Sequence, residues 1–451
     1  MRSLGPTRTI VEHFVASLMV LCGFAFAGTR AAHGQSPSLE VDLRAMKAGK
    51  DGFAAPIAGG GRARLTLVPD LQEAAERHLA DSEIPYGAVV MISIPDGKIL
   101  TLAGRSELDP RMGPVDLALK AWAPAASIFK IVTAAALVTA GGISPDAKAC
   151  YAGGLHGIGP QDLRDNPRLD KRCESLKVAV GRSQNVVVAK LALKHLSPSS
   201  LGRTARDFGF GQRIPFVADL EVSAAKMPSD DLEFARAAAG FFHSSLSPLH
   251  GALIAATVAN GGLMPGPILV RRATDGSGRP RPIPTPRGRR VVGPKTARAL
   301  GAMMETTVTL GTARSSFRDR RGRKFLPFAV AGKTGSLNYR GRKGDPPMPR
   351  AGLVSNYLQY NWFVGYAPCE KPKVAFATIV ANPAKWRIKA TYLARRMLEA
   401  WWAKEKSDKA KASAAKAPQT ASSPDGRRDG RTVSAASTSN RSASRDGLPK
   451  I

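Results

Sequence analysis

A serine and a lysine three residues apart could together form an activated nucleophile. Ser127 and Lys130 lie in PAASIFKIVTAAALVTAGG, whose apolar run predicts a helix from about Ser127 to Ala140 that ends at Gly141. Residues three apart on a helix are neighbours on one face. A serine hydroxyl needs a base to take its proton, and a lysine can serve if burial keeps it neutral. The pair alone is also typical of a helix-capping serine and a lysine that reaches solvent.

A second polar segment could supply a proton relay. In GRSQNVV, Ser183 and Asn185 are two residues apart on a predicted turn, so their side chains can point the same way. The hydroxyl could pass a proton to a leaving group, and the amide could hold a substrate amide. Taken alone, this segment is also typical of an ordinary capping turn.

A third segment, AVAGKTGS, ends an apolar strand and could bind a carboxylate. Lys333 offers positive charge, Thr334 and Ser336 offer hydroxyls, and Gly335 lets another backbone segment approach closely. The backbone N–H groups of Ser336 and Ser127 could form an oxyanion hole. Taken alone, the segment could be a turn at a sheet edge.

Together and in this order, the three motifs resemble those of the penicillin-binding protein transpeptidase domain, in the penicillin-recognising serine enzyme superfamily. The resemblance covers residues 65–402 and includes LTLVPDLQEAAERHL, GAVVMISIPDGKILTLAG, SLSPLHGALIAATVANGG, GTARSSF and WFVGYAP, in the domain's order. It implies a mixed α/β (α+β) fold of the β-lactamase/transpeptidase type. In that fold a central, mostly antiparallel sheet is flanked by helices and joined to an all-helical subdomain.

The resemblance also implies a serine D,D-transpeptidase that cross-links peptidoglycan stem peptides ending in D-alanyl-D-alanine. The acyl-enzyme would form on Ser127, with Lys130 as its base, and Ser183 would relay the proton to the leaving amine. The acyl group would then pass to an acceptor amine of a neighbouring stem peptide. β-Lactams would acylate Ser127 as substrate mimics.

The remaining implied roles concern substrate binding. Asn185 would hold the peptide, and Lys333, Thr334 and Ser336 would bind the terminal carboxylate. Ser336 stands where the family more often has threonine, but it keeps the hydroxyl. No cofactor is implied, and no metal is expected because the seven histidines are scattered without ligand spacing.

Three alternatives use the same fold. Water as the acceptor would make the protein a D,D-carboxypeptidase or endopeptidase. A β-lactamase would need a glutamate that positions the deacylating water; Glu221 lies in the right interval, but LEVSAAK lacks the surrounding proline and asparagine. A non-catalytic wall-binding domain is the third alternative, and the three intact motifs disfavour it.

Strands and helices must hold these motifs in place. A helix is predicted over residues 70–80, followed by a hairpin of strands 87–94 and 98–104. Helices are then predicted within 175–196 and 243–262, strands at 328–336, 361–368 and 373–382, and a last helix over 390–403. The pattern predicts one sheet built from both ends of the domain, with a helical block between.

The two ends of the chain differ from the predicted catalytic domain, residues 64–402. Arg2 and Arg8 precede the apolar stretch FVASLMVLCGFAFA, which predicts a signal peptide over residues 1–27 or a single N-terminal anchor. Export to the periplasm or to the outer face of the inner membrane follows. Residues 28–63 are predicted to be a linker, and residues 403–451 a basic disordered tail.

The net charge of +31 and the pI of about 10.5 allow two interpretations. An anionic wall or membrane surface could bind the basic tail, and cell-wall synthesis proteins are possible partners. Otherwise, arginine is simply abundant and spread over loops. No nucleic-acid motif occurs, so a nucleic-acid partner is not expected.

The cysteines indicate the redox compartment. Cys150 and Cys173 flank a polar segment and could form a disulfide in an oxidising compartment. Two unpaired cysteines remain the alternative, because the sequence does not show whether their Cα atoms lie within bridging distance.

Overall fold

The computed structural model describes residues 39–109, 112–153, 157–340 and 357–416. The predicted signal peptide or anchor, the first part of the predicted linker and the tail beyond residue 416 lie outside the described residues. Within these ranges, no helix combines the length and apolarity needed to cross a bilayer.

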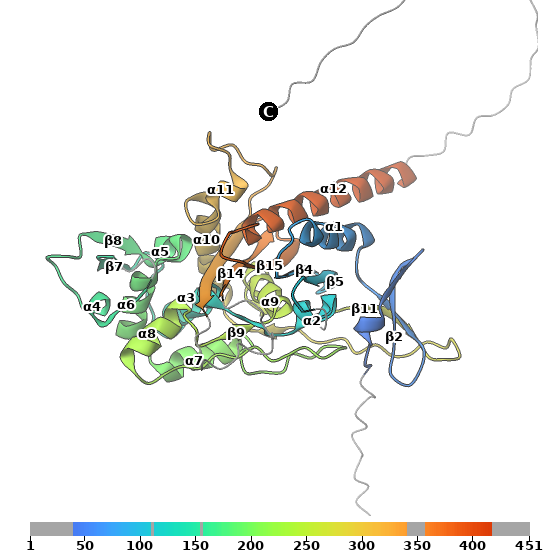
Figure 1. Ribbon diagram of the computed structural model, residues 1–451, viewed down its shortest axis with the longest axis horizontal. Helices are drawn as coiled ribbons and strands as arrows, with labels where there is room; N and C mark the ends of the chain where they lie inside the picture. Colours follow the sequence, from blue (N-terminus) through green and yellow to red (C-terminus); the bar gives the residue numbers. More distant parts are fainter. Residues whose placement is uncertain (1–38, 110–111, 154–156, 341–356, 417–451) are drawn as a thin grey trace, which may run out of the picture.

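A five-stranded antiparallel sheet forms the centre of the fold, in the order β13-β14-β15-β4-β5 (Figure 1). Two strands come from the beginning of the domain and three from its end. Their bounds are β4 (Tyr86–Ser93), β5 (Ile99–Ser106), β13 (Ala331–Arg340), β14 (Tyr357–Ala367) and β15 (Val374–Asn382). Strand β13 lies at the edge, so the backbone groups on its outer side have no strand partner among the described residues.

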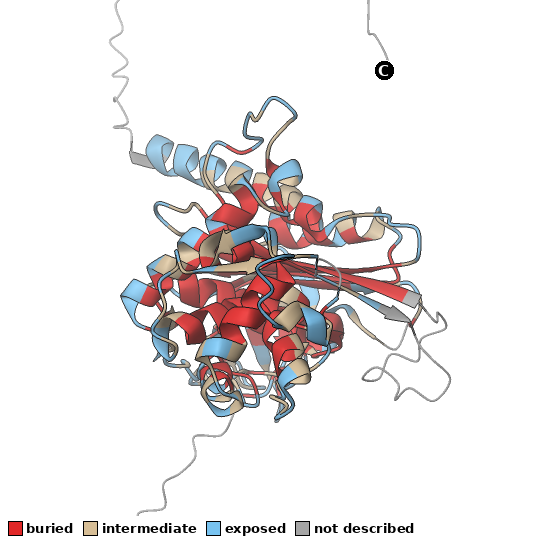
Figure 2. Ribbon diagram, turned by 90° about the vertical axis from the view of Figure 1, so that its left-hand side faces the viewer, coloured by how far each residue is buried: buried red, intermediate tan, exposed pale blue. Residues whose placement is uncertain are grey.

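Helices cover both faces of this sheet (Figures 1 and 2). Helices α1 and α12 pack on one face, and α2 and α9 on the other. Their bounds are α1 (Pro69–Ala80), α12 (Ala390–Lys416), α2 (Pro114–Leu119) and α9 (Pro248–Ala259). Side chains of β4 alternate between the layers: Val89 joins the cluster of α1 and α12, and Val90 joins the other. Burial on both faces explains the nearly continuous apolar strands.

In the sequence, a block of helices separates the two sets of strands. In space this block lies beside the sheet, on the left in Figure 1. It contains η2 (Ala126–Phe129), α3 (Lys130–Thr139), α4 (Pro160–Leu163), α5 (Leu176–Arg182), α6 (Asn185–His195), α7 (Pro198–Asp207) and α8 (Asp231–Ala239). Helices α10 (Pro294–Thr309) and α11 (Arg314–Phe317) lead back to β13. The predicted α+β architecture with a helical subdomain is confirmed.

Short strand pairs connect these parts. They are β6 (Ala123–Pro124) with β9 (Ser245–Leu246), β7 (Lys148–Tyr151) with β8 (Arg172–Ser175), and β10 (Leu263–Met264) with β12 (Arg289–Arg290). Cys150 and Cys173 lie opposite each other in the β7–β8 pair and form a disulfide. The Nζ atom of Lys190 on α6 donates to the carbonyl oxygen of Cys150, which ties this hairpin to the helical block.

The prediction that residues 28–63 form a linker is wrong for the described part, from residue 39 onward. Residues 39–65 contain η1 (Leu43–Ala45), β1 (Lys47–Gly49), β2 (Gly52–Pro56) and β3 (Arg62–Leu65), and β3 pairs with β11 (Val270–Thr274). Phe53, Ala55 and Ile57 are buried at alternate positions. This period of two is hard to see in the sequence because alanine and glycine fill much of the segment.

The predicted disordered tail begins too early. Helix α12 continues through residues 403–416, where Lys404 pairs with Asp408 one turn on and Lys409 lies over the Trp402 ring. Lysine, glutamate and alanine favour the helical conformation. The earlier turns of α12, which pack on the sheet, have already nucleated the helix, so it continues into residues 403–416.

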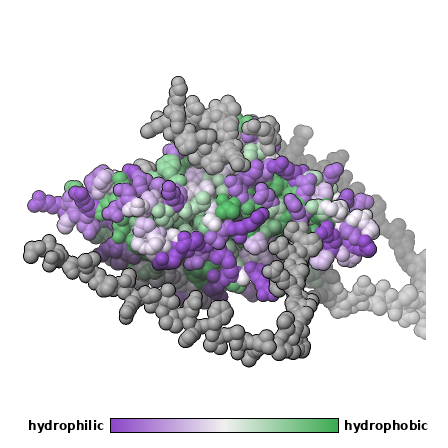
Figure 3. All heavy atoms as spheres, turned by 90° about the horizontal axis from the view of Figure 1, so that it is seen from below, coloured by the Kyte–Doolittle hydropathy of each residue, from purple (hydrophilic) through white to green (hydrophobic). Residues whose placement is uncertain are grey.

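Exposed arginines occur on separate elements, among them Arg64 on β3, Arg271 on β11 and Arg298 on α10. Seen from below, the described residues present mainly hydrophilic side chains, with apolar side chains in smaller areas between them (Figure 3). This distribution favours the interpretation that much of the positive charge is spread over a solvated surface.

Candidate active site

Ser127 sits in a tight turn that leads into a buried helix. It lies in η2, immediately before α3, so the predicted helix begins as a 3₁₀ turn. The preceding Ala126 has a φ of 49°, a left-handed conformation that is unusual for a residue with a side chain. Gly240 passes beneath this turn: a Cβ atom on Gly240 would lie 2.2 Å from the carbonyl oxygen of Ala126. The turn is therefore held by close backbone packing.

Lys130 is fully buried beneath Ser127. Its Nζ atom lies 2.7 Å from Ser127 Oγ, 2.7 Å from Asn185 Oδ1 and 2.7 Å from the carbonyl oxygen of Ala239. Ala239 is the last residue of α8, where helical carbonyls lack partners within the helix. The lysine thus connects the nucleophile helix, the second motif and the end of α8.

The surroundings of Lys130 favour its neutral form. Burial lowers the pKa of Lys130 well below its ordinary value of 10.5, and the positive charge of Lys333 lowers it further. A neutral amine has two N–H groups and one lone pair. The Asn185 and Ala239 oxygens can only accept, so they take the two N–H groups. The lone pair is then left for the Ser127 hydroxyl, which donates to it.

The second motif lies where the chain breaks between two helices. Residues 175–196 form α5 and α6 rather than one continuous helix, and Ser183 at the break has a left-handed φ of 58°. Asn185 is the first residue of α6. Because of this break, Asn185 Oδ1 reaches Lys130 while Ser183 Oγ faces Lys333.

The third motif lies on edge strand β13. Lys333 is fully buried, and its Nζ atom donates to Ser183 Oγ at 2.9 Å and to the carbonyl oxygen of Thr334 at 2.8 Å. Burial lowers the pKa of Lys333 to about 7. The two buried lysines thus belong to one network that brings the three motifs together.

The hydroxyls of β13 are held by neighbouring side chains. The Thr334 and Thr312 hydroxyls form a hydrogen bond, and Asn361 Nδ2 donates to Ser336 Oγ at 3.0 Å. Gly335 lies against the nucleophile turn, where a Cβ atom would come within 3.2 Å of the Ile128 side chain. Glycine thus lets β13 pack next to Ser127.

A cavity of about 530 Å³ opens over these groups. Of the predicted site residues, Ser127, Ser183, Asn185, Thr334 and Ser336 line it. Lys130 and Lys333 lie buried beneath its floor. The disulfide is outside this lining.

Several lining residues were not predicted from the sequence. Thr312 follows α10, Asn361 lies on β14, Phe242 follows α8, and Trp386 and Lys389 lie on the loop between β15 and α12. Thr312 belongs to GTARSSF, which carried part of the resemblance but no assigned role. The loop residues have no periodic pattern that could have identified them.

Glu221 does not occupy the position that a β-lactamase requires. Its carboxylate accepts from the backbone N–H of Ala121 at 3.0 Å, and it does not line the cavity. No aspartate or glutamate is among the described residues that line the cavity. Within the same described ranges, no group of three or more His, Cys, Asp or Glu side chains could hold a metal ion.

Residues 87–399 match the family model described as the penicillin binding protein transpeptidase domain. The chain belongs to this family. The match begins at the second residue of β4 and ends in α12, so it includes the central sheet apart from Tyr86, and the helical block. The family identified from the three motifs is confirmed.

Curated members of the penicillin-binding protein family are distant from this chain. Penicillin-binding protein PbpB of Mycolicibacterium smegmatis is 24% identical over 72% of the chain and 51% of PbpB, so the chain covers about half the length of that relative. Peptidoglycan D,D-transpeptidase PbpA of the same organism is 26% identical, over 72% of the chain and 68% of PbpA.

Solved penicillin-binding protein structures share the fold. Penicillin-binding protein A of Mycobacterium tuberculosis superposes with a TM-score of 0.58 and 24% identity, over 77% of the chain and 81% of its own. The D,D-transpeptidase domain of a peptidoglycan glycosyltransferase from Eggerthella lenta gives a TM-score of 0.61 and 22% identity. That superposition covers 82% of this chain and 92% of the Eggerthella domain. The predicted transpeptidase-like fold is therefore confirmed.

Proposed function

We propose that the protein is a serine D,D-transpeptidase that acts on peptidoglycan stem peptides through an acyl-enzyme on Ser127. The observation that carries this proposal is the buried Lys130 amine, 2.7 Å from Ser127 Oγ. Two acceptor oxygens occupy its N–H groups, which suits it to accept a proton. Family membership and the relatives named D,D-transpeptidases support the same reaction.

In the first half-reaction, Ser127 Oγ attacks the carbonyl carbon of the penultimate D-alanine, and its proton moves to Lys130 Nζ. The backbone N–H groups of Ser127 and Ser336 would stabilise the oxyanion. Ser183 gives its hydroxyl proton to the leaving amine and regains one from Lys333 Nζ, which lies 2.9 Å away. A lysine with a pKa of about 7 is suited to this donation at neutral pH.

Substrate binding is assigned to the remaining motif residues. Thr334 and Ser336 donate hydroxyl hydrogen bonds to the terminal carboxylate, and the charge of Lys333 attracts it. Asn185 Nδ2 binds the peptide backbone while its Oδ1 accepts from Lys130. In the second half-reaction, the acceptor amine attacks the ester carbonyl.

The alternatives differ in how the acyl-enzyme breaks down. The cavity lining contains no described carboxylate that could activate water, and Glu221 binds elsewhere, which disfavours a β-lactamase. A D,D-carboxypeptidase would use the same residues with water as acceptor. A non-catalytic wall-binding domain is disfavoured because the cavity is open to Ser127.

We infer that the protein works outside the cytoplasm, in the periplasm or at the outer face of the inner membrane. The Cys150–Cys173 disulfide is typical of an oxidising compartment. Stem peptides as substrates and β-lactams as inhibitors follow from the proposed reaction. An anionic wall or membrane surface for the basic tail, and a complex with cell-wall synthesis proteins, are further proposals.

A time course of labelling by a fluorescent penicillin tests the proposal. We expect a covalent band that persists for hours, since no carboxylate among the described lining residues is placed to activate water. A band that fades within minutes would favour a β-lactamase, and absence of any band from folded protein would favour a binding domain. Incubation with a D-alanyl-D-alanine peptide and an acceptor amine, followed by mass spectrometry, separates cross-linking from hydrolysis.

A further inference from the structure

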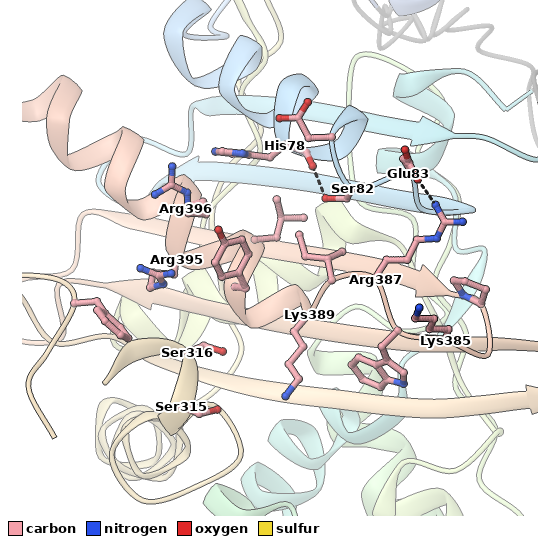
Figure 4. Close-up of a pocket in the computed structure, with 17 residues that line it drawn as sticks. His78, Ser82, Glu83, Ser315, Ser316, Lys385, Arg387, Lys389, Arg395 and Arg396 are labelled. Carbon is pink, nitrogen blue, oxygen red and sulfur yellow. Dashed lines mark hydrogen bonds and ion pairs between the residues drawn. The ribbon is translucent and has the colours of Figure 1, made fainter. Parts of the chain in front are cut away.

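A second and larger hollow adjoins the active-site cavity. Its volume is about 1330 Å³, and α1, α11, α12 and the loop between β15 and α12 form its walls (Figure 4). We call it the basic groove, because its cationic side chains outnumber its carboxylates. They are Lys385, Arg387, Lys389, Arg395 and Arg396, against Asp81 and Glu83.

Several of these cations already have partners, and two do not. Arg387 pairs with Glu83 at 2.7 Å, and Arg395 and Arg396 both pair with Glu399. Lys385 and Lys389 form no ion pair with any described residue and are exposed. Figure 4 shows Arg387 turned toward Glu83 while Lys389 extends away from that pair. The groove therefore retains positive charge that a ligand could neutralise.

The basic groove also offers aromatic surface. Trp386 is 41% exposed and Tyr392 is 44% exposed, and both line the groove. Exposed aromatic side chains beside unpaired cations are suited to an acidic peptide, because the rings cover apolar atoms while the lysines bind carboxylates.

The basic groove and the active-site cavity share a wall. Trp386 and Lys389 line both of them. Beside these residues, the Ser316 hydroxyl in the groove bonds the Thr391 hydroxyl in the cavity at 2.7 Å. The backbone N–H of Ala390, next to Lys389, donates to Asn361 Oδ1 at 2.7 Å, and Asn361 Nδ2 donates to Ser336 Oγ. The groove therefore meets the cavity on the side that Ser336 and Asn361 line.

We propose that the basic groove binds a carboxylate-bearing segment of the acyl acceptor and directs its amine to the acyl-enzyme. This inference rests on the proposed transpeptidase function. The leaving amino acid carries the carboxylate assigned to Thr334 and Ser336, so it departs on the side of the cavity that meets the groove. By microscopic reversibility, the incoming amine enters along the path by which the leaving amine departs.

The transfer step needs only the acyl-enzyme and the acceptor amine. The acceptor nitrogen attacks the ester carbonyl, the new C–N bond forms, and the bond to Ser127 Oγ breaks. The amine proton passes by way of Ser183 to Lys333, which gave one up in the first half-reaction, and protonated Lys130 returns its proton to Ser127 Oγ. The cations of the groove assist in a second way: they disfavour the ammonium form of the acceptor, so more of it is present as the nucleophilic amine.

The test compares two synthetic acceptors that share one free amine. One acceptor carries two carboxylates, and the other carries the same groups as carboxamides. The full-length protein is supplied with a D-alanyl-D-alanine donor, and mass spectrometry gives the ratio of transfer to hydrolysis. The acidic acceptor is expected to transfer roughly fivefold better at low salt, since each exposed ion pair contributes modestly, and less so as salt rises.

Two double variants complete the test. Lys385→Gln with Arg387→Gln removes two charges from the groove, and Lys47→Gln with Lys50→Gln removes two exposed charges near the β1–β2 turn. The preference for the acidic acceptor should fall to roughly twofold in the first, because Lys389 still offers one unpaired charge there, and persist at roughly fivefold in the second. No preference in the wild type, or equal loss in both double variants, would overturn the proposal.

Acylation of Ser127 can be measured separately from acceptor binding in the groove. Fluorescent penicillin should label both double variants as it labels the wild type, which tests Ser127 chemistry separately. Fluorescence polarisation with the two labelled acceptors tests the groove without turnover. If the groove variant lost binding to anionic phospholipid vesicles but kept its acceptor preference, the groove would be a membrane contact and the acceptor proposal would be wrong.

Discussion

The Nζ atom of Lys130 lies 2.7 Å from Ser127 Oγ, and the same amine is shared with two oxygens that can only accept hydrogen bonds. Those two oxygens, from Asn185 and Ala239, orient the lysine as firmly as the serine does. A charged lysine would donate to all three atoms and leave the serine proton without an acceptor. The function of the pair therefore depends on Lys130 being neutral.

The first prediction concerns pH. The apparent second-order rate constant for acylation by a penicillin should rise as Lys130 loses its proton, because only neutral Lys130 can accept from Ser127. The rate constant should fall again as pH rises through about 7, because in the enzyme without ligand Lys333 then loses the charge that attracts the penicillin carboxylate. Stopped-flow absorbance with a chromogenic β-lactam between pH 5 and 10 measures both the rise and the fall of this rate constant. A rate constant that is flat across this range would contradict the lysine assignments.

The second prediction concerns the base itself. Lys130→Met keeps an unbranched side chain but removes the amine, so acylation of Ser127 should slow by roughly 10²–10⁴-fold. Lys130→Arg should not restore it, because arginine stays charged. The exposed Lys226→Met is the matched control and should acylate normally. Circular dichroism melting identifies any variant that has lost its fold, and a folded Lys130→Met with normal acylation would exclude this base.

The third prediction tests the packing beneath the nucleophile. Gly240→Ala should lower the free energy of unfolding by about 2–4 kcal/mol, because φ is +88° and the new Cβ would clash with the Ala126 carbonyl. Gly211→Ala also stands at positive φ, +69°, but has nothing within 4 Å. It should cost only about 1 kcal/mol. Equal losses in urea unfolding would mean that the contact with Ala126 does not matter.

The fourth prediction concerns Thr312, which bonds the Thr334 hydroxyl. Thr312→Val keeps the shape but removes the hydrogen bond that orients Thr334 toward the substrate carboxylate. The acylation rate constant should fall roughly three- to tenfold, the cost of about one hydrogen bond. Thr309→Val, at a more distant helical position, serves as the control. If the two variants behave alike, Thr312 has no role in binding.

Much of the site could be predicted because its residues occur in short motifs. The spacing of Ser127 and Lys130, and the order of the two later motifs, were sufficient to assign both the family and the candidate residues. The apolar segments of β4 and β5 and the turn residues between them likewise predicted the hairpin at Gly97. These features are local in the sequence.

What could not be predicted depends on contacts between distant segments. The break at Ser183 arises from a left-handed residue that is not glycine, and an apolar pattern continues on both sides of it. The hydrogen bond of Lys130 to Ala239 joins residues 109 positions apart. The first sheet was missed because its strands are short and rich in alanine, and one of its partners, β11, lies some 200 residues later in the chain.

Intact-protein mass spectrometry after incubation with benzylpenicillin tests the central claim most directly. We expect one adduct per chain with the full mass of the penicillin, located by proteolysis on the peptide that contains Ser127. The adduct should be absent from Ser127→Ala and unchanged in the exposed control Ser199→Ala. An adduct that persists in Ser127→Ala, or folded wild-type protein that forms none, would contradict an acyl-enzyme on Ser127.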